Sequence, residues 1–152
     1  LFGDGEAVGE CGAAWVRASM DTRQIIRLAT VHELDGTGGG ELCKSKKLSK
    51  LRLPQKLELA GRRKLRYSDT DLNGHVNNTR YADFACDALE MERLGPDRFL
   101  SSMQIGYLAE CRPGEELLLW TKEQDGTHFV QGMDEGGKSR FEAALIFGEV
   151  LP

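Results

Sequence analysis

A short polar segment, residues 67–81, holds the side chains best suited to chemistry. It reads Tyr-Ser-Asp-Thr-Asp-Leu-Asn-Gly-His-Val-Asn-Asn-Thr-Arg-Tyr and so gathers carboxylates, amides and an imidazole. A carboxylate can act as base or nucleophile, an amide can orient a carbonyl or a water, and an imidazole can shuttle a proton. Asp71, Asn73 and His75 occupy every second position, so an extended backbone would send all three side chains the same way. The segment predicts a reaction site, with an elaborate turn and helix cap as the alternative.

The elements on either side must position these groups. A strand is expected over residues 62–67 and a helix from Tyr81, where apolar residues recur every three or four positions. The Gly-Pro pair at 95–96 predicts the end of this helix, and Asn77 or Asn78 can cap its start. The first turn of a helix presents unpaired N–H groups and a partial positive charge, so it would polarise a carbonyl oxygen and stabilise an oxyanion.

The same segment closely resembles the signature of the acyl-acyl carrier protein thioesterases. Their pattern, Asp-x-Asn-x-His-Val-Asn-Asn followed by Tyr, is matched by residues 71–78 and by Tyr81. A second family element, a strand ending in Glu-Cys after the helix, is matched by the Tyr-Leu-Ala-Glu-Cys of residues 107–111. The resemblance covers residues 61–152, and the N-terminal third in outline. It implies the hotdog fold, an α+β fold in which an antiparallel sheet wraps around one central helix.

Carried over by position, the resemblance implies catalytic roles for Asp71, Asn73, His75 and Glu110. Asp71 would be the base or nucleophile, held with the substrate carbonyl by Asn73 and His75. Glu110 would position or activate water, and the helix N-terminus would serve as the oxyanion hole. In the alternative mechanism, Cys111 forms a papain-like triad with His75 and Asn73. We favour the carboxylates, because Cys111 also fits the simpler interpretation of a small buried residue.

The reaction implied is hydrolysis of a fatty acyl-acyl carrier protein, as in fatty acid biosynthesis, with release of the free acid and the carrier thiol. One alternative is an acyl-CoA thioesterase of the same fold. The alternative from another class is a non-catalytic acyl-binding or dimerisation module. The resemblance implies acyl carrier protein as partner and a homo-oligomer, because hotdog domains generally pair. It implies no cofactor and no metal.

The rest of the chain after the helix is predicted to form strands. They are expected over residues 103–110, 116–123, 127–134 and 141–150, separated by turns rich in Gly, Pro and Asp. One strand, one helix and four strands is an α+β order that favours an antiparallel sheet. This order favours the hotdog fold independently of the motif.

The N-terminal third resembles only part of a hotdog repeat. Strands are expected over residues 6–18 and 23–31, which resemble the closing strands of a first repeat. We therefore divide the chain into a partial N-terminal hotdog repeat at 1–36, a basic linker at 37–60 and a complete C-terminal hotdog domain at 61–152.

Positive charge is concentrated in and beside the linker. Residues 44–66 contain ten Lys and Arg residues against one acidic residue, Glu58, in a chain with a net charge of −4. Such a run is either a solvated linker or a docking surface for an acidic macromolecule, such as acyl carrier protein. Nucleic acid is not expected, because no aromatic residue lies between Lys44 and Arg66 to stack on bases.

Composition is that of an ordinary soluble protein. The 152 residues are 40% hydrophobic and 29% charged, and no apolar run is long enough to span a membrane. The four cysteines lack the spacing of a metal site or of a redox pair. We interpret them as reduced thiols of a cytoplasmic protein of bacterial type, with the plastid stroma as the alternative compartment.

Overall fold

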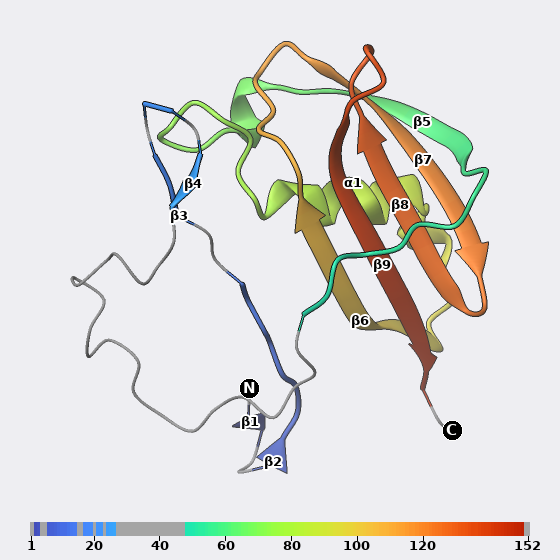
Figure 1. Ribbon diagram of the computed structural model, residues 1–152. Helices are drawn as coiled ribbons and strands as arrows, with labels where there is room; N and C mark the ends of the chain where they lie inside the picture. The colour runs from blue at the N-terminus through green and yellow to red at the C-terminus, as the bar shows by residue number, and fades with distance from the viewer. Residues whose placement is uncertain are drawn as a thin grey trace. The chain divides into compact units, whose positions relative to one another are not determined.

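The computed structural model describes residues 2–3, 6–14, 17–19, 21–22, 24–26 and 48–150 (Figure 1). The chain divides into two compact units, Leu1–Ser49 and Lys50–Pro152.

In the first unit, the described strands are two residues long. They pair antiparallel as β1 (Phe2–Gly3) with β2 (Glu6–Ala7) and β3 (Arg17–Ala18) with β4 (Ile25–Ile26). The expected single strand over residues 6–18 is wrong, because residues 8–14 have no regular structure. Most of the strand expected over residues 23–31 lies outside the described residues. The partial repeat at 1–36 and the linker at 37–60 stay predictions.

The second unit contains the sheet and the helix. Its elements are β5 (Glu58–Lys64), the 3-10 turn η3 (Tyr67–Asp69), α1 (Arg80–Ala88), the 3-10 turn η4 (Met91–Arg93), β6 (Arg98–Tyr107), β7 (Glu116–Gln124), β8 (Thr127–Met133) and β9 (Ser139–Glu149). The five strands form one antiparallel sheet in the order β5-β7-β8-β9-β6, and α1 lies across one of its faces (Figure 1). The predicted α+β hotdog fold is confirmed.

Local turn chemistry connects the later strands as predicted. Asp125 and Gly126, between β7 and β8, have φ angles of 51° and 73°. This two-residue loop needs positive φ at both positions, which a Gly adopts without strain and an Asp tolerates. Gly137, in the turn between β8 and β9, has a φ of 80°. These turns set the register that places alternate strand residues against the helix.

The core lies between α1 and the inner face of the sheet. Tyr81, Phe84 and Ala85 form the buried face of the helix, as expected from their spacing. They belong to one cluster with strand residues that alternate along the chain, which are Leu117, Leu119, Val130, Phe141, Ala143 and Leu145. Because successive strand residues point to opposite faces, this alternation directs one face of the sheet toward the helix.

The helix is shorter than predicted. We expected it to continue to the Gly-Pro pair at 95–96, but α1 ends at Ala88. Glu90 has a φ of 50°, the left-handed conformation that typically terminates a helix. Leu89 packs on the edge of the core, and the chain continues through η4 to β6. Within the described part of the chain, no helix has the length and apolar character needed to cross a membrane.

Candidate active site

The strand β5 leads into the polar segment through a buried acidic residue. Asp69 has a relative exposure of 1%, the lowest of the charged side chains that the structure describes. Its Oδ2 accepts a hydrogen bond from the Arg66 backbone N–H at 2.7 Å, and its Oδ1 lies 3.4 Å from Arg63 Nη2 and 3.6 Å from Arg80 Nε. Buried carboxylates are stable only when paired in this way. Asp69 therefore anchors the segment between β5 and α1.

Sequence reasoning did not single out Asp69. The available signal was a pattern of charge, in which Arg63 and Arg66 precede Asp69 in the sequence and Arg80 follows it. That pattern is common on solvated surfaces, so it could not show that this carboxylate is buried.

Asp71 begins a tight turn that ends at His75. The Asp71 N–H donates to the His75 carbonyl at 2.9 Å, and the Gly74 N–H donates to the Asp71 carbonyl at 3.1 Å. Gly74 has a φ of 72°, which a residue without a side chain adopts most readily. The half-buried carboxylate of Asp71 accepts from the Asn73 N–H at 2.8 Å. The backbone over 71–75 is therefore a tight turn, not the extended loop that would send the three side chains the same way.

The turn separates the three predicted residues. Asn73 and its neighbour Leu72 are exposed at the tip, whereas Asp71 and His75 are half-buried at the base. Thr70 and Val76, which flank the turn, form an antiparallel bridge. The catalytic roles of Asp71, Asn73 and His75 stay predictions.

His75 and Glu110 lie side by side, although 35 positions separate them in the sequence. His75 Nε2 is 3.3 Å from Glu110 Oε2, and the two side chains are 21% and 52% exposed. The Val76 N–H donates to the carbonyl of Cys111 at 2.9 Å, which joins the two loops beside this pair. An imidazole next to a carboxylate, both accessible to water, can hold and transfer a proton. Two of the predicted residues thus form one polar pair.

A turn at Asn77 precedes α1, whose N-cap residue, Thr79, makes no side-chain capping hydrogen bond. Asn77 Oδ1 accepts hydrogen bonds from the Thr79 N–H at 3.0 Å and from the Thr79 hydroxyl at 2.9 Å. The Asn77 N–H itself donates to the Asp69 carbonyl at 2.8 Å. The helix start is therefore attached to the buried Asp69 anchor, and both lie next to the 71–75 turn in the chain.

Aromatic packing holds the same end of the helix on the sheet. Tyr81 makes ring contacts with Tyr107 at 5.6 Å and Phe141 at 5.2 Å between centroids. The Tyr107 hydroxyl donates to the Asn78 carbonyl at 3.2 Å. Offset and edge contacts of this kind stabilise a pair beyond its buried area. They fix the helix start relative to β6 and β9.

Cys111 faces the core rather than the polar pair. Its relative exposure is 0%, and it belongs to the same buried cluster as Tyr81. Burial is the main cause that raises the pKa of the Cys111 thiol above its usual value, and burial likewise raises the pKa of Tyr81. A thiol with a raised pKa is protonated at neutral pH and is a poor nucleophile.

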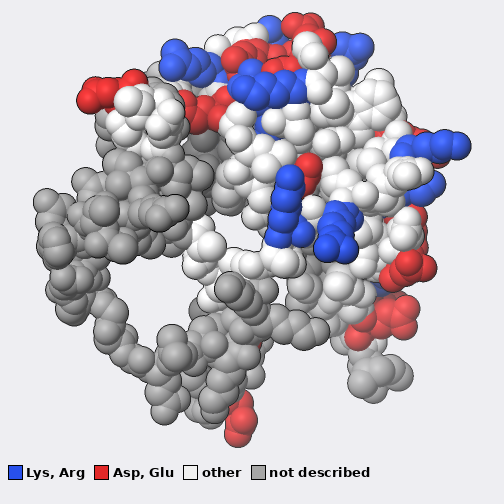
Figure 2. Space-filling model, viewed as in Figure 1, with Lys and Arg blue, Asp and Glu red and all other residues white. Residues whose placement is uncertain are grey.

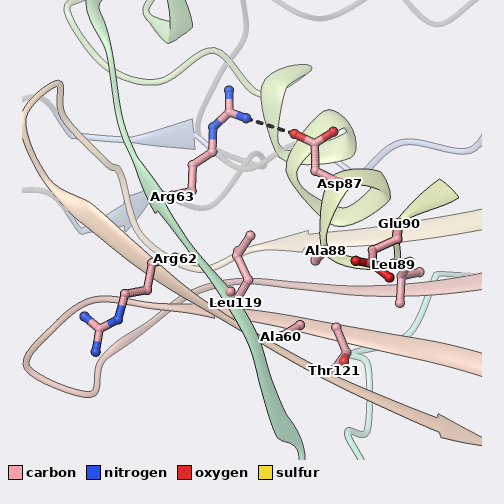
Figure 3. Close-up of a pocket in the computed structure, with 10 residues that line it drawn as sticks. Ala60, Arg62, Arg63, Asp87, Ala88, Leu89, Glu90, Leu119 and Thr121 are labelled. Carbon is pink, nitrogen blue, oxygen red and sulfur yellow. Dashed lines mark hydrogen bonds and ion pairs between the residues drawn. The ribbon is translucent and has the colours of Figure 1, made fainter. Parts of the chain in front are cut away.

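The described part of the chain also has a cavity of about 620 Å³, between β5, β7 and the C-terminal half of α1 (Figure 3). Ala60, Leu119 and Ala88 contribute to its lining, and Arg63 spans it to Asp87 with a 2.9 Å ion pair. The predicted site residues precede the other end of α1 or follow β6. The cavity is therefore separate from the His75–Glu110 pair.

Comparison with known proteins gives a family and a fold. The family model described as the acyl-ACP thioesterase C-terminal domain matches residues 55–148. A solved structure of an acyl-ACP thioesterase from Bacteroides thetaiotaomicron has a TM-score of 0.67 and 22% sequence identity, and the match covers 86% of this chain and 53% of that chain. This chain thus spans about half the length of the Bacteroides protein.

Two solved structures of proteins shorter than the Bacteroides protein share the fold. A hypothetical protein from Staphylococcus aureus, in complex with CoA, has a TM-score of 0.54 and 14% identity, covering 62% of this chain and 78% of that chain. A putative thioesterase from Pseudomonas putida has a TM-score of 0.53 and 20% identity, covering 64% of this chain and 75% of that chain. No curated protein sequence matches the chain.

Proposed function

This chain belongs to the family of acyl-ACP thioesterase C-terminal domains, and we propose that it contributes the catalytic residues of a thioesterase that hydrolyses fatty acyl-acyl carrier protein. The oxygen of water is added to the thioester carbonyl carbon, the carbon–sulfur bond breaks, and the products are a fatty acid and the carrier thiol. The observation that carries the proposal is the 3.3 Å approach of His75 and Glu110 beside the 71–75 turn. No cofactor or metal takes part in the proposed reaction.

In the proposed mechanism, Glu110 and His75 activate the attacking water. The water proton passes to this pair and then to the leaving sulfur, because microscopic reversibility lets the base act next as the acid. Asp71 is either a second base for this water or a nucleophile. As a nucleophile it displaces the carrier thiolate and forms an acyl anhydride, which the activated water then hydrolyses to the fatty acid and the free Asp71 carboxylate. Asn73 orients the carbonyl. The N-terminus of α1 supplies donors and partial positive charge for the oxyanion.

We propose that Cys111 is not the nucleophile. Cys111→Ala should retain kcat to within about threefold, because the thiol is buried and protonated, whereas loss of a true nucleophile costs several orders of magnitude. Steady-state hydrolysis of lauroyl-acyl carrier protein measures this. Cys111→Ser is the matched control, since it keeps a small side chain of similar size at this buried position. Loss of activity in both folded variants would establish the thiol mechanism instead.

We propose acyl carrier protein, rather than CoA, as the donor. The described part of the basic stretch has exposed Lys50, Arg52 and Lys56, and Figure 2 shows several basic side chains on the face turned to the viewer. Complementary charge mainly speeds encounter with an acidic partner. The S. aureus structure was solved with CoA, which keeps an acyl-CoA thioesterase as the alternative.

Changing Lys50, Arg52 and Lys56 together to Gln should raise the KM for lauroyl-acyl carrier protein about tenfold, since each exposed charge contributes a few tenths of a kcal/mol or more. The KM for lauroyl-CoA should change much less. The comparison is made at two salt concentrations, with Arg93→Gln and Lys138→Gln as controls for exposed charge elsewhere. Equal effects on both substrates would argue against carrier docking at this stretch. The pairing of copies and the cytoplasmic location stay predictions.

A further inference from the structure

Arg140, at the start of β9, is a partly buried cation beside the loop that carries Glu110. Its side chain is 16% exposed. Nη1 donates to the Glu110 carbonyl, Nε donates to Asp134 Oδ2 at 3.0 Å, and Nη2 lies 3.6 Å from Glu115 Oε1. The planar guanidinium can serve several acceptors at fixed angles, which a Lys ammonium cannot do. Arg140 thus joins three separate parts of the chain.

The backbone of Arg140 holds the same loop. Its carbonyl accepts hydrogen bonds from the Leu108 N–H at 2.9 Å and from the Ala109 N–H at 3.1 Å. These are the two residues between the end of β6 at Tyr107 and Glu110. The side chain and the main chain of one residue therefore fix the path of the chain up to Glu110.

The attachment continues from that loop to His75. Directly after Glu110, the Cys111 carbonyl accepts from the Val76 N–H at 2.9 Å, and Val76 directly follows His75. The Arg140 guanidinium is thus hydrogen-bonded to the backbone of Glu110, and the next residue, Cys111, is hydrogen-bonded to the residue after His75. A shift of the 108–111 loop would change the 3.3 Å separation of His75 and Glu110.

The turn between β8 and β9 keeps the guanidinium in place. Asp134 Oδ1 accepts from the Lys138 N–H at 2.8 Å, while its other oxygen holds Arg140. The Lys138 N–H first, and the Arg140 guanidinium after it, lower the pKa of Asp134, so this side chain is a carboxylate at neutral pH. On the other side, Glu115 Oε2 accepts from the Arg112 N–H at 3.0 Å. Both carboxylates that face Arg140 are therefore held by backbone donors.

We propose that Arg140 is a positioning residue that sets the distance and orientation of Glu110 relative to His75. This inference rests on the proposed thioesterase function and adds a residue that touches neither the substrate nor the reacting water. Arg140 acts through the backbone of the 108–111 loop. Catalysis is sensitive to such positioning, because a displacement of about 1 Å can cost about 10²-fold in rate.

The test compares Arg140→Met with Arg140→Lys in the whole 152-residue chain, on lauroyl-acyl carrier protein. We expect Arg140→Met to lower kcat by about 10- to 100-fold with KM within about twofold of the parent. Arg140→Lys should recover part of kcat, since it keeps a cation near Asp134 and Glu115. Arg93→Met is the matched control, because Arg93 is 72% exposed in a surface ion pair with Glu90, and it should leave kcat unchanged.

A second measurement does not depend on activity. The ¹⁵N signals of the His75 imidazole should move in Arg140→Met in the same direction as in Glu110→Gln, and they should stay in place in Arg93→Met. Inactivity of the parent chain on thioesters would overturn the proposed function, while these signals would still test the positioning. A parental kcat in Arg140→Met, or unchanged His75 signals in it, would each overturn the role of Arg140.

Discussion

Asp71→Asn is expected to lower kcat for lauroyl-acyl carrier protein by about 10²- to 10⁴-fold, the range for losing a positioned acid–base group. Asn keeps an oxygen that can accept from the Asn73 N–H, a contact of 2.8 Å in the parent. The 71–75 turn should therefore survive. The amide cannot take a proton from water or attack a carbonyl, so only the chemistry is removed.

Asp125→Asn is the matched control for this substitution. Asp125 is an exposed residue of the β7–β8 turn with a φ of 51°, which Asn also adopts readily. The Asp125→Asn variant should have the same kcat and KM as the parent chain. Binding of an acyl ligand without turnover, in the parent and in Asp71→Asn alike, would favour the non-catalytic acyl-binding module. Parental turnover in Asp71→Asn would remove Asp71 from the mechanism.

Phe84→Ala is expected to lower the free energy of unfolding by about 3–5 kcal/mol, the usual cost of truncating a buried Phe. Phe84 is completely buried on the sheet-facing side of α1 and meets the Tyr81 ring at 5.8 Å. The Arg63 guanidinium lies 4.4 Å from the centre of its ring, and Arg63 also contacts Asp69. The space left by removing the Phe84 ring would thus loosen both the core and Asp69, which anchors the polar segment.

Urea-induced unfolding followed by circular dichroism measures this loss. Phe99→Ala is the control, because Phe99 is 48% exposed on the edge strand β6 and its truncation should cost far less. Phe84→Leu should give an intermediate loss, since it refills part of the cavity. Equal losses for Phe84→Ala and Phe99→Ala would contradict the core described for α1.

Local sequence patterns were sufficient for the order of the elements in the second unit. The apolar spacing that begins at Tyr81 predicted the helix, and the Asp-Gly pair at 125–126 predicted a hairpin, since both depend on residues a few positions apart. The end of the helix was not predicted. Gly and Pro at 95–96 are strong terminators, whereas the left-handed Glu90 that follows α1 has no such signature.

The motif likewise identified His75 and Glu110 as candidates, but the every-second-residue spacing over 71–75 did not show how the loop folds. Alternation indicates an extended strand only when no local hydrogen bond competes. Here the Asp71 carboxylate accepts from the Asn73 N–H and Gly74 takes a positive φ, so a turn forms instead.

The sequence by itself therefore determined that a helix begins near Tyr81, the order of the strands that follow it, their turns and the residue types available for thioester chemistry. Only the tertiary structure decided that Glu110 meets His75, that Cys111 lies with Tyr81 in the core, and that a buried Asp69 and a partly buried Arg140 act as anchors. The physical reason is how far apart in the sequence the interacting residues lie. Turns and helices depend on neighbours along the chain, whereas burial and long-range pairing depend on which strands of the sheet become adjacent.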